Sequence, residues 1–469
     1  MTNRPCCEHA IVVGAGIAGL LAARALSDHF SQVTVLDRDV LPSTSMPRAG
    51  VPQGYHLHAL LPRGLQVMEA FFPGLSAEMQ RAGAIAIDTG ADIAWLTPEG
   101  WGVQTKAELI GISSTRNLLE YTIRQRVKAL PNVRISHSTE VTGLLREIRG
   151  RITGVRSRKR TDAADRAKVQ TADLVVIDSG RQNAIHQWFG EVGLDLPRTT
   201  VIDAHIGYAS RFYRRKEGET ADWQALILQS APPHARRGGI MFPMEGGHWL
   251  VTLSGGDYDY PPTDEAGFLE FARSLRSPDL YQAIRNAEPV SSIRGFRSTE
   301  NRRQHFERIK NWPDGLLVMG DAACAFNPIY GQGMSTAALE AAALRRLLTE
   351  SADPTRMGRT FQREVARILR SPWTLAACSD LRFASVEGAR AGLIVRFMHG
   401  YIDRVLRLGT MDPWARRRFL EVQGMMREIS AVLRPDMFRR VINKSLPWVK
   451  RNRLPLAGGP GLPAVDKSV

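Results

Sequence analysis

Three glycines near the start of the chain constrain its fold more than any other feature. Gly14, Gly16 and Gly19 follow an apolar stretch that ends at Val13. A helical pattern comes next, and then a second apolar stretch that ends at Asp37. In this arrangement Gly14 allows a tight turn, Gly16 lets backbone N–H groups approach a pyrophosphate, and Gly19 lets the helix pack closely on the strand. The spacing predicts a βαβ unit that binds a dinucleotide.

The residues that follow these glycines indicate what the unit would bind. Ile17 and Ala18 lie within the glycine segment, before the helix expected at residues 20–26, whose dipole and unpaired N–H groups favour a phosphate. Asp37 lies 18 residues after Gly19, at the distance where a carboxylate accepts hydrogen bonds from an adenosine ribose. A glycine turn made for packing alone would not explain the coincidence of strand, glycines, helix, strand and acid. FAD and NAD share this adenosine, so the motif alone leaves both cofactors open.

A second motif, far along the chain, separates these two cofactors. Asp321 ends another apolar strand, and an aspartate in this position can bond the ribityl chain of a flavin. Gly331, Gly333 and Met334 open the next helix and would present N–H groups to the flavin pyrimidine edge, where reduced flavin gathers negative charge. Pro328 precedes them in the same stretch. A buried strand before an N-capped helix would explain the aspartate but not the glycine pair, so the motif favours FAD.

Apolar periodicity predicts an α/β chain in which two domains are interleaved. Alternating strands and helices indicate a Rossmann-like FAD-binding domain of the glutathione-reductase βαβ type, with a helical pattern at residues 57–72. A period of two indicates an antiparallel β-sheet substrate domain, and a helical C-terminal region with a flexible tail follows. The FAD-binding domain is expected at residues 1–83, 112–203 and 299–365, the substrate domain at residues 84–111 and 204–298, and the C-terminal region at residues 366–469.

Cysteine content and hydropathy bear on the compartment. Only four cysteines occur, and their spacing suits neither a disulfide framework nor a metal site. No leader pattern precedes the first strand, and no apolar run approaches the roughly 20 residues that span a bilayer. We therefore expect a soluble, cytoplasmic protein without a metal.

The chain is basic, with a formal net charge of +15, and the excess is concentrated near the C-terminus. Residues 381–456 contain 16 basic and 6 acidic residues, interspersed with apolar residues at helical spacing. No nucleic-acid-binding motif accompanies them, so nucleic acid is not an expected partner. Solvated helices are the favoured explanation, while a weak contact with a membrane surface or an acidic carrier protein stays open. The oligomeric state is open as well.

Three further segments carry a family resemblance. They are residues 48–58 (RAGVPQGYHLH), residues 178–181 (DSGR) and residues 320–335 (GDAACAFNPIYGQGMS). With the glycine fingerprint and the middle β region, nearly the whole chain resembles the single-component FAD-dependent monooxygenases with the aromatic hydroxylase fold. More narrowly, these segments resemble the flavin-dependent epoxidases of polyether antibiotic biosynthesis, of the lasalocid and monensin type.

The resemblance implies roles for further residues. Arg38 and Arg116 would lie near the FAD pyrophosphate, the main chain of Val141 near the adenine, and Arg48 and Gln53 near the flavin ring. For the arginines the alternative is a solvated surface, and for the glutamine it is a polar loop. The histidines at positions 56 and 58 are expected to serve as caps or in core hydrogen bonds rather than in catalysis.

The resemblance also implies the reaction. Reduced FAD would react with O₂ to give a C4a-hydroperoxide, which would transfer one oxygen to an electron-rich substrate, so no catalytic side chain is expected. Asp178 stands in an Asp-Ser-Gly-Arg segment where aromatic hydroxylases usually have Asp-Gly, which leaves the approach of NAD(P)H in doubt. Because no second complete glycine fingerprint occurs, NAD(P)H would dock transiently or a separate flavin reductase would supply electrons.

The substrate class follows from the middle region of the chain. Apolar side chains with few polar anchors would line the pocket, which favours a lipophilic polyketide or terpenoid alkene over a small phenolate. The candidate pocket residues are Phe212, Leu226, Met241, Phe242 and Trp249.

Epoxidation is therefore the leading interpretation, and three others remain. Aromatic hydroxylation shares the fold, and so does reduction or dehydrogenation of an isoprenoid by a flavin-linked enzyme. A flavin halogenase usually carries a Trp-x-Trp-x-Ile-Pro segment, and none of the nine tryptophans here has a partner two residues away.

Overall fold

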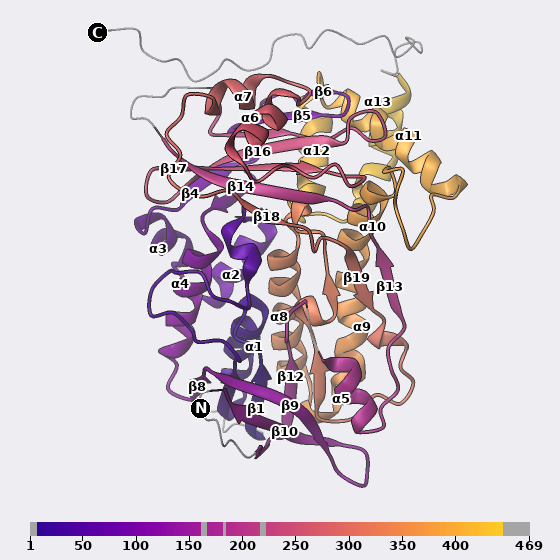
Figure 1. The fold of residues 1–469 in the computed structure, drawn as a ribbon. Helices are drawn as coiled ribbons and strands as arrows, with labels where there is room; N and C mark the ends of the chain where they lie inside the picture. The colour runs from indigo at the N-terminus through magenta and orange to yellow at the C-terminus, as the bar shows by residue number, and fades with distance from the viewer. Residues whose placement is uncertain (1–6, 161–166, 182–183, 216–221, 444–469) are drawn as a thin grey trace.

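The computed structural model describes residues 7–160, 167–181, 184–215 and 222–443. Figure 1 shows a parallel sheet at one end of the molecule and a larger sheet at the other, with the long helix α8 (Gly333–Glu350) between them. Within the described residues, no helix combines the length and the apolar character needed to cross a bilayer.

The parallel sheet confirms the Rossmann-like part of the expected fold. Its five strands run in the order β20-β12-β1-β2-β8, and their residues are mostly aliphatic and buried, as in parallel sheets covered by helices on both faces. Helix α1 (Ile17–Ser27) packs against α8 beside this sheet. The strands are β1 (Cys7–Val13), β2 (Phe30–Leu36), β8 (Val133–Ser136), β12 (Leu174–Ile177) and β20 (Leu316–Val318).

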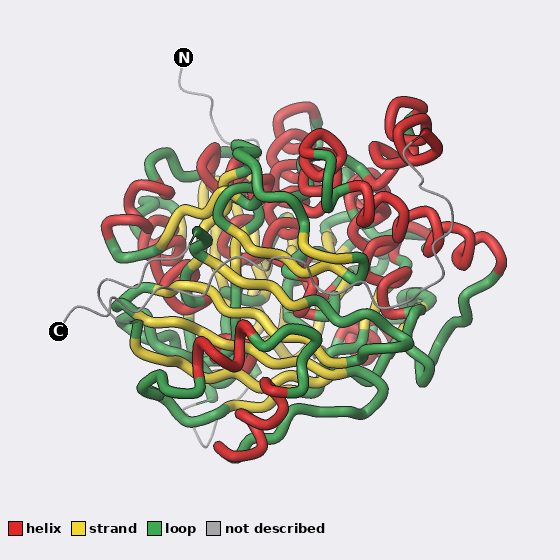
Figure 2. The backbone as a smooth tube through the Cα atoms, turned by 90° about the horizontal axis from the view of Figure 1, so that it is seen from above, coloured by secondary structure: helices red, strands yellow, loops and turns green. Residues whose placement is uncertain are grey.

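A seven-stranded sheet forms the other end of the molecule, in the order β18-β14-β17-β16-β15-β5-β6. Seen from above, its strands lie side by side with short helices in front of them (Figure 2). Buried side chains of α6 (Glu265–Arg273) and α7 (Asp279–Ile284) pack on one face. The strands are β5 (Ile93–Thr97), β6 (Gly100–Trp101), β14 (Gly207–Arg214), β15 (Ala225–Leu228), β16 (Arg237–Met244), β17 (His248–Gly255) and β18 (Arg294–Phe296).

One strand pair in this sheet departs from the expected antiparallel pattern. Strand β5 pairs with β15 in parallel, with Ile93 opposite Ala225. A parallel pair needs a long connection between its strands, and here strands β8 and β12 of the parallel sheet lie between the two in the sequence. Alternation within each strand does not reveal this, because parallel and antiparallel strands share a period of two.

Three small sheets of three strands each complete the fold. Strands β9 and β10 form a hairpin beside the parallel sheet, and β3 and β4 both pair with β7. The strands are β3 (Ala59–Leu60), β4 (Ile85–Asp88), β7 (Ile110–Ser113), β9 (Thr139–Arg146), β10 (Ile152–Lys159), β11 (Lys168–Thr171), β13 (Thr199–Ile202), β19 (Asn301–Gln304) and β21 (Cys324–Ala325).

The remaining helices surround both lobes. The N-terminal half supplies α2 (Pro62–Phe71), α3 (Leu75–Arg81), α4 (Arg116–Lys128) and α5 (Ile185–Glu191). The C-terminal region supplies α9 (Gly358–Ile368), α10 (Arg370–Asp380), α11 (Leu393–Leu408), α12 (Pro413–Gln423) and α13 (Pro435–Asn443). Residues 444–469, which include the expected flexible tail, lie outside the described residues.

Two helical segments differ from the sequence expectation. The helix expected at residues 57–72 begins at Pro62, because proline suits a first helical position and the residues before it form strand β3. The C-terminal helices are interrupted before α11, where Gly388 adopts a φ of +84° and packs on Val201. A Cβ at Gly388 would lie 1.9 Å from the Val201 carbonyl oxygen. The backbone at Gly388 therefore lies against Val201 in a left-handed conformation and does not continue the helix.

Candidate active site

A cleft of about 380 Å³ opens at the carboxyl ends of the parallel strands. It is lined by most residues that the sequence assigns to cofactor binding. They are Gly14, Gly16, Ile17, Ala18, Asp37, Arg38, Arg48, Gln53, Arg116, Val141, Asp321, Pro328, Gly331, Gly333 and Met334.

Gly19 does not line this cleft but lies beneath it. A Cβ at Gly19 would lie 2.0 Å from the Gly14 carbonyl oxygen, so helix and turn approach more closely than any side chain allows. Gly14 adopts a φ of +109°, and a Cβ there would lie 1.9 Å from the carbonyl oxygen of Asp178. The glycines therefore let strand β1, its turn and helix α1 pack against β12.

Two helices begin at this cleft. Ile17 and Ala18 belong to the first turn of α1, and Gly333 and Met334 to the first turn of α8. N–H groups in a first turn have no intrahelical acceptor, and the helix dipole adds positive potential there. The cleft thus offers two separate sites for anionic groups, as a dinucleotide with a pyrophosphate and an electron-rich ring would need.

Asp37 is held in place at the end of β2. Its Oδ2 accepts a hydrogen bond from the Ala15 amide at 2.7 Å, and its Oδ1 accepts one from the Asp39 amide at 2.8 Å. Only 5% of the residue is exposed. The glycine turn and the carboxylate expected to meet a ribose are therefore one rigid unit.

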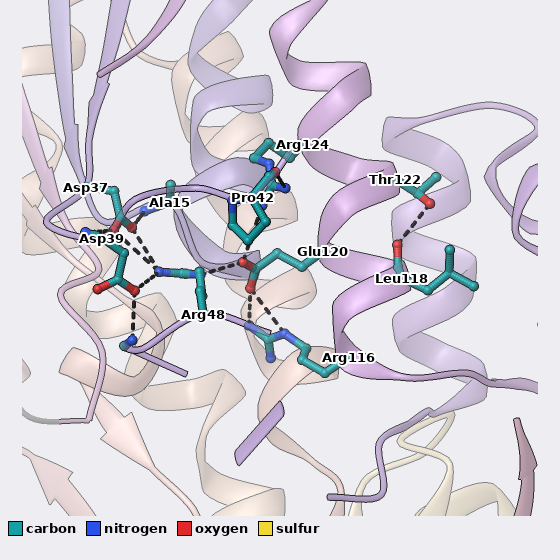
Figure 3. A network of polar contacts seen from close by, with 11 residues as sticks. Ala15, Asp37, Asp39, Pro42, Arg48, Arg116, Leu118, Glu120, Thr122 and Arg124 are labelled. Atoms are coloured by element: carbon teal, nitrogen blue, oxygen red, sulfur yellow. Dashed lines mark hydrogen bonds and ion pairs between the residues drawn. The ribbon is translucent and has the colours of Figure 1, made fainter. Parts of the chain in front are cut away.

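Arg48 lies at the centre of a buried network of charges (Figure 3). Its Nη1 lies 2.7 Å from Asp39 Oδ2 and 3.4 Å from Asp37 Oδ1. Its Nε donates to Glu120 Oε1 at 2.7 Å. Burial alone would lower the pKa of the guanidinium, but the surrounding carboxylates raise it, so Arg48 stays charged.

Glu120 is the acidic residue that joins this network to α4. Arg116 Nη2 lies 3.0 Å from Glu120 Oε2, and Arg124 Nη1 lies 3.8 Å from Glu120 Oε1. Burial would raise the pKa of Glu120, but Arg116 and Arg48 outweigh it and lower the pKa. The sequence analysis missed Asp39 and Glu120, although the spacing of Arg116, Glu120 and Arg124 four residues apart is a detectable signal.

A second group of carboxyls lies under the opposite side of the cleft. Gly19 N–H donates to Asp178 Oδ2 at 2.8 Å, and Gly320 N–H donates to Glu340 Oε2 at 2.7 Å. Burial raises the pKa of Asp178 well above its usual range, and Asp321 raises it further. Burial also raises the pKa of Glu340 to about 8. The second motif therefore rests on a carboxyl group that keeps its proton to a higher pH than an exposed glutamate does.

A separate cavity of about 370 Å³ lies between the seven-stranded sheet and the C-terminal helices. Leu57, Ala59, Pro328 and Gly331 line both this cavity and the cleft. The two spaces therefore meet beside the second motif, which was expected from the sequence to contact the flavin.

The strands present different residues to this cavity than the sequence analysis expected. Of the five candidates, only Phe242 lines it. Leu226, Met241 and Trp249 belong to the buried cluster on the opposite face, against α6 and α7. The correction follows from alternation, because a shift of one residue moves a side chain to the other face of a sheet. The neighbouring strand residues line the cavity instead, namely Ile227, Ile240, Thr252 and Ser254.

The expectation that Phe212 lines the cavity is wrong for a different reason. It packs on a smaller buried cluster that contains Leu250, and its ring lies 6.4 Å from that of His248, near the end of the strand. It therefore lies beyond the cavity along β14, and period two alone cannot locate the cavity along a strand.

The polar groups in the cavity come from several elements, among them β14, β17 and the turn before α8. His56 Nδ1 lies 2.8 Å from Ser210 Oγ, which in turn lies 2.7 Å from Thr252 Oγ1. Burial lowers the pKa of His56 to about 4, so the imidazole is neutral. The Tyr208 hydroxyl and Gln332 Oε1 have no hydrogen-bond partner among the described residues. These two buried groups can bond a ligand.

Charge is scarce in the cavity. Among the described residues that line it, Arg382 is the one Lys, Arg, Asp or Glu. Its Nη2 lies 2.8 Å from Asp403 Oδ1 and donates to the His399 carbonyl at 3.0 Å, so much of its charge is compensated. The cavity therefore suits a largely uncharged ligand.

The C-terminal helices supply a wall of this cavity that the sequence analysis did not assign. Helices α10, α11 and α12 contribute residues such as Leu375, Met398, Ile402, Leu406 and Phe419. Their helical periodicity predicts a buried face but not the element against which that face lies.

No group of three or more His, Cys, Asp and Glu side chains is arranged to hold a metal ion within the part of the chain that the structure describes.

Comparison with known proteins agrees with this geometry. A family model of the NAD(P)-binding Rossmann-like domain matches residues 12–81, which contain the glycine turn and Asp37. Protein Rv3254 of Mycobacterium tuberculosis is 31% identical over 460 residues, which cover 95% of this chain and 96% of that protein.

Two more distant similarities extend over most of the chain. Kynurenine 3-monooxygenase of Salinispora arenicola is 28% identical over 433 residues, which cover 88% of this chain and 84% of that enzyme. The crystal structure of PqsL, a probable FAD-dependent monooxygenase from Pseudomonas aeruginosa, has a TM-score of 0.56 at 16% identity. The superposition covers 87% of this chain and 98% of PqsL, and it shows that the fold is shared.

Proposed function

The chain belongs to the family of Rv3254 within the superfamily of FAD-dependent monooxygenases, and we propose that it epoxidises an alkene of a lipophilic polyketide or terpenoid. The single observation that carries this proposal is the junction of an anion-binding cleft with a nearly uncharged cavity at Pro328 and Gly331. Such a junction lets a cofactor ring and an apolar substrate meet without crossing water.

The residues of the cleft fit FAD. The first turn of α1 would hold the pyrophosphate, Asp37 the adenosine ribose, and Asp321 the ribityl chain. The first turn of α8 would hold the pyrimidine edge of the flavin. Once bound and reduced, FAD would supply the two electrons that activate O₂; one atom of O₂ would go to the substrate and the other would leave as water.

The protein itself would orient the substrate and keep water out of the cavity. Apolar side chains of the sheet and of α11 line the cavity and would keep water away from a bound substrate and from the activated oxygen. The Tyr208 hydroxyl can donate to a carbonyl or hydroxyl oxygen of the substrate, because no described residue accepts its proton. This bond would fix which carbon–carbon double bond faces the junction.

The electron source is a separate part of the proposal. The sequence contains one complete glycine fingerprint, which the FAD would occupy. NAD(P)H would therefore dock transiently, or a separate flavin reductase would deliver the electrons.

The proposal is tested by incubating the FAD-loaded protein with ¹⁸O₂ and a set of unsaturated polyketides and terpenes. NADH or NADPH is the reductant, with and without a flavin reductase. We expect an epoxide that carries one ¹⁸O atom, detected by mass spectrometry. A saturated product without ¹⁸O would replace the proposal with a flavin-linked reductase. An aromatic hydroxylation product or a product halogenated in the presence of bromide would likewise contradict epoxidation.

A further inference from the structure

Helix α11 has two faces with different surroundings. One face lines the cavity through Met398, His399, Ile402 and Leu406. Because an α-helix turns once every 3.6 residues, Leu393 and Phe397 lie on the other side of the helix. Figure 1 shows α11 at the margin of the molecule, beside α13. The helix is thus a wall between the cavity and the outside.

The outer face of α11 carries large apolar side chains in solvent. Leu393 is 84% exposed, Ile394 is 80% exposed and Phe397 is 68% exposed. Single exposed apolar residues are common on soluble proteins, but three on adjacent positions of one helical turn form a patch that usually has a partner. We call these three residues the α11 patch.

Positive charge surrounds the α11 patch. Arg390, Arg396 and Arg404 are exposed, and none of them has a carboxylate partner within the described residues. From Gly388 to Ile402 the sequence contains no acidic residue. The flanking acids are engaged, since Glu387 lies 3.1 Å from His205 and Asp403 pairs with Arg382.

We propose that the α11 patch docks on the surface of an anionic lipid bilayer. Apolar side chains at the tip of a helix enter the acyl boundary, and arginines beside them meet lipid phosphates, which is the composition of interfacial helices. The docked face is the outer side of the cavity wall, so a lipophilic substrate dissolved in the bilayer would lie next to the cavity. The delivery of a lipophilic substrate to the cavity rests on the proposed function, whereas docking itself does not.

Two other occupants fit the patch less well. A second copy of the chain would bring its own arginines to the same surface, and three side chains are few for an interface that must bury about 1,000 Å² or more. An acidic carrier protein would match the charge but would have to offer a groove for three adjacent apolar tips. A bilayer satisfies both the apolar tips and the arginines at once.

The test is flotation of the full-length, FAD-loaded protein with vesicles of phosphatidylcholine alone or mixed with phosphatidylglycerol. We expect binding to the anionic vesicles, weak binding to the neutral ones, and release by high salt. The triple variant L393S/I394S/F397S should lower the bound fraction at least about ten-fold. Replacing Arg390 and Arg396 with Gln should lower partitioning by about five-fold for each arginine.

A matched control lies at the far end of the molecule. Ile148 is 106% exposed and Val169 is 64% exposed, both near basic residues of the β9–β11 sheet, so I148S/V169S removes similar surface. This control should float as the unaltered protein does. Circular dichroism melting checks that each variant folds, and the salt dependence of the unaltered protein needs no variant.

Three outcomes would overturn the proposal. These are failure of the unaltered protein to bind anionic vesicles, equal binding by the triple variant, or a patch-dependent dimer in sedimentation without vesicle binding. Flotation requires no turnover, so its result is independent of the ¹⁸O₂ assay. A protein that binds vesicles but forms no epoxide would retain the docking surface and lose only the proposed reaction.

Discussion

Arg48 Nε donates to Glu120 Oε1 at 2.7 Å, and this contact ties the loop after β2 to helix α4. The same guanidinium also binds Asp39 at the start of this loop, so two positions of the loop and helix α4 share one cation. A planar guanidinium can bond several carboxylates in fixed directions, whereas an ammonium acts as a point charge. The geometry of the cleft near Gln53 therefore depends on this arginine.

The variant Arg48→Lys should weaken FAD binding by about ten-fold or more and lower stability by about 1–3 kcal/mol, because buried carboxylates lose partners. Titration of apoprotein with FAD, followed by flavin fluorescence, measures the first effect, and thermal melting measures the second. Arg126→Lys is the control, since Arg126 pairs with Glu78 on the more exposed side of α4. Equal FAD affinities for the two variants would contradict the role of Arg48.

The variant Gly19→Ala should abolish FAD retention. Its methyl group would lie 2.0 Å from the Gly14 carbonyl oxygen, so helix α1 or the turn must move. Gly190→Ala in α5 is the matched control, because nothing lies within 4 Å of the added Cβ. Absorbance of the purified proteins near the flavin band compares their cofactor content. A fully yellow Gly19→Ala protein would show that the close approach is not required.

Backbone requirements made the cleft predictable from sequence. Gly14, Gly16 and Asp37 are recognisable because a tight turn and a terminal acid leave few choices of residue. The cavity was less predictable, because alternation identifies two faces without saying which one meets the helices. Leu226 and Ile227 are adjacent apolar residues, and only tertiary packing assigns the first to the core and the second to the cavity.

These two residues give a paired test of the cavity. Leu226→Ala should cost about 2–5 kcal/mol of stability, as truncations in a packed core do, and leave KM nearly unchanged. Ile227→Ala enlarges the cavity, so it should cost less stability and alter KM or the preferred substrate length. Denaturant unfolding and steady-state kinetics on both proteins decide the matter. If Leu226→Ala instead altered KM and Ile227→Ala instead caused the larger loss of stability, the opposite face of the sheet would bind the substrate.

Removing the Tyr208 hydroxyl should separate binding from folding. Tyr208→Phe deletes a buried group that has no partner among the described residues, so stability should stay equal or rise slightly. KM should increase about ten-fold for a substrate with a carbonyl or hydroxyl group, and less for a pure hydrocarbon. Tyr213→Phe, on the same strand but packed in the opposite cluster, controls for general effects. If Tyr208→Phe changed KM by the same factor for the oxygenated substrate and for the hydrocarbon, this bond would be excluded.

Glu340 should make stability depend on pH. Its pKa is about 8 in the folded protein and 4.5 when unperturbed, because burial disfavours the charged form. Between these values the unfolded chain has lost the proton that the folded protein keeps, so stability falls as pH rises through this window. Glu340→Gln removes the proton and keeps an acceptor for the Gly320 amide.

The variant Glu340→Gln should therefore melt within about 1 °C of the unaltered protein near pH 5 and several degrees higher near pH 8.5. Glu350→Gln, at the exposed end of the same helix, should show no such difference. Thermal melting at both pH values checks this expectation. A constant difference between the two proteins across the range would mean that Glu340 ionises normally.

The order of strands in the parallel sheet has a consequence for folding during synthesis on the ribosome. Strand β20 and helix α8 follow residue 315, so the edge of the parallel sheet and the partner of α1 are synthesised late. A nascent chain exposes the glycine turn and the apolar surface of α1 long before it can close the cleft. Translation that stalls before α8 would yield a substrate for chaperones or proteases and never a flavoprotein.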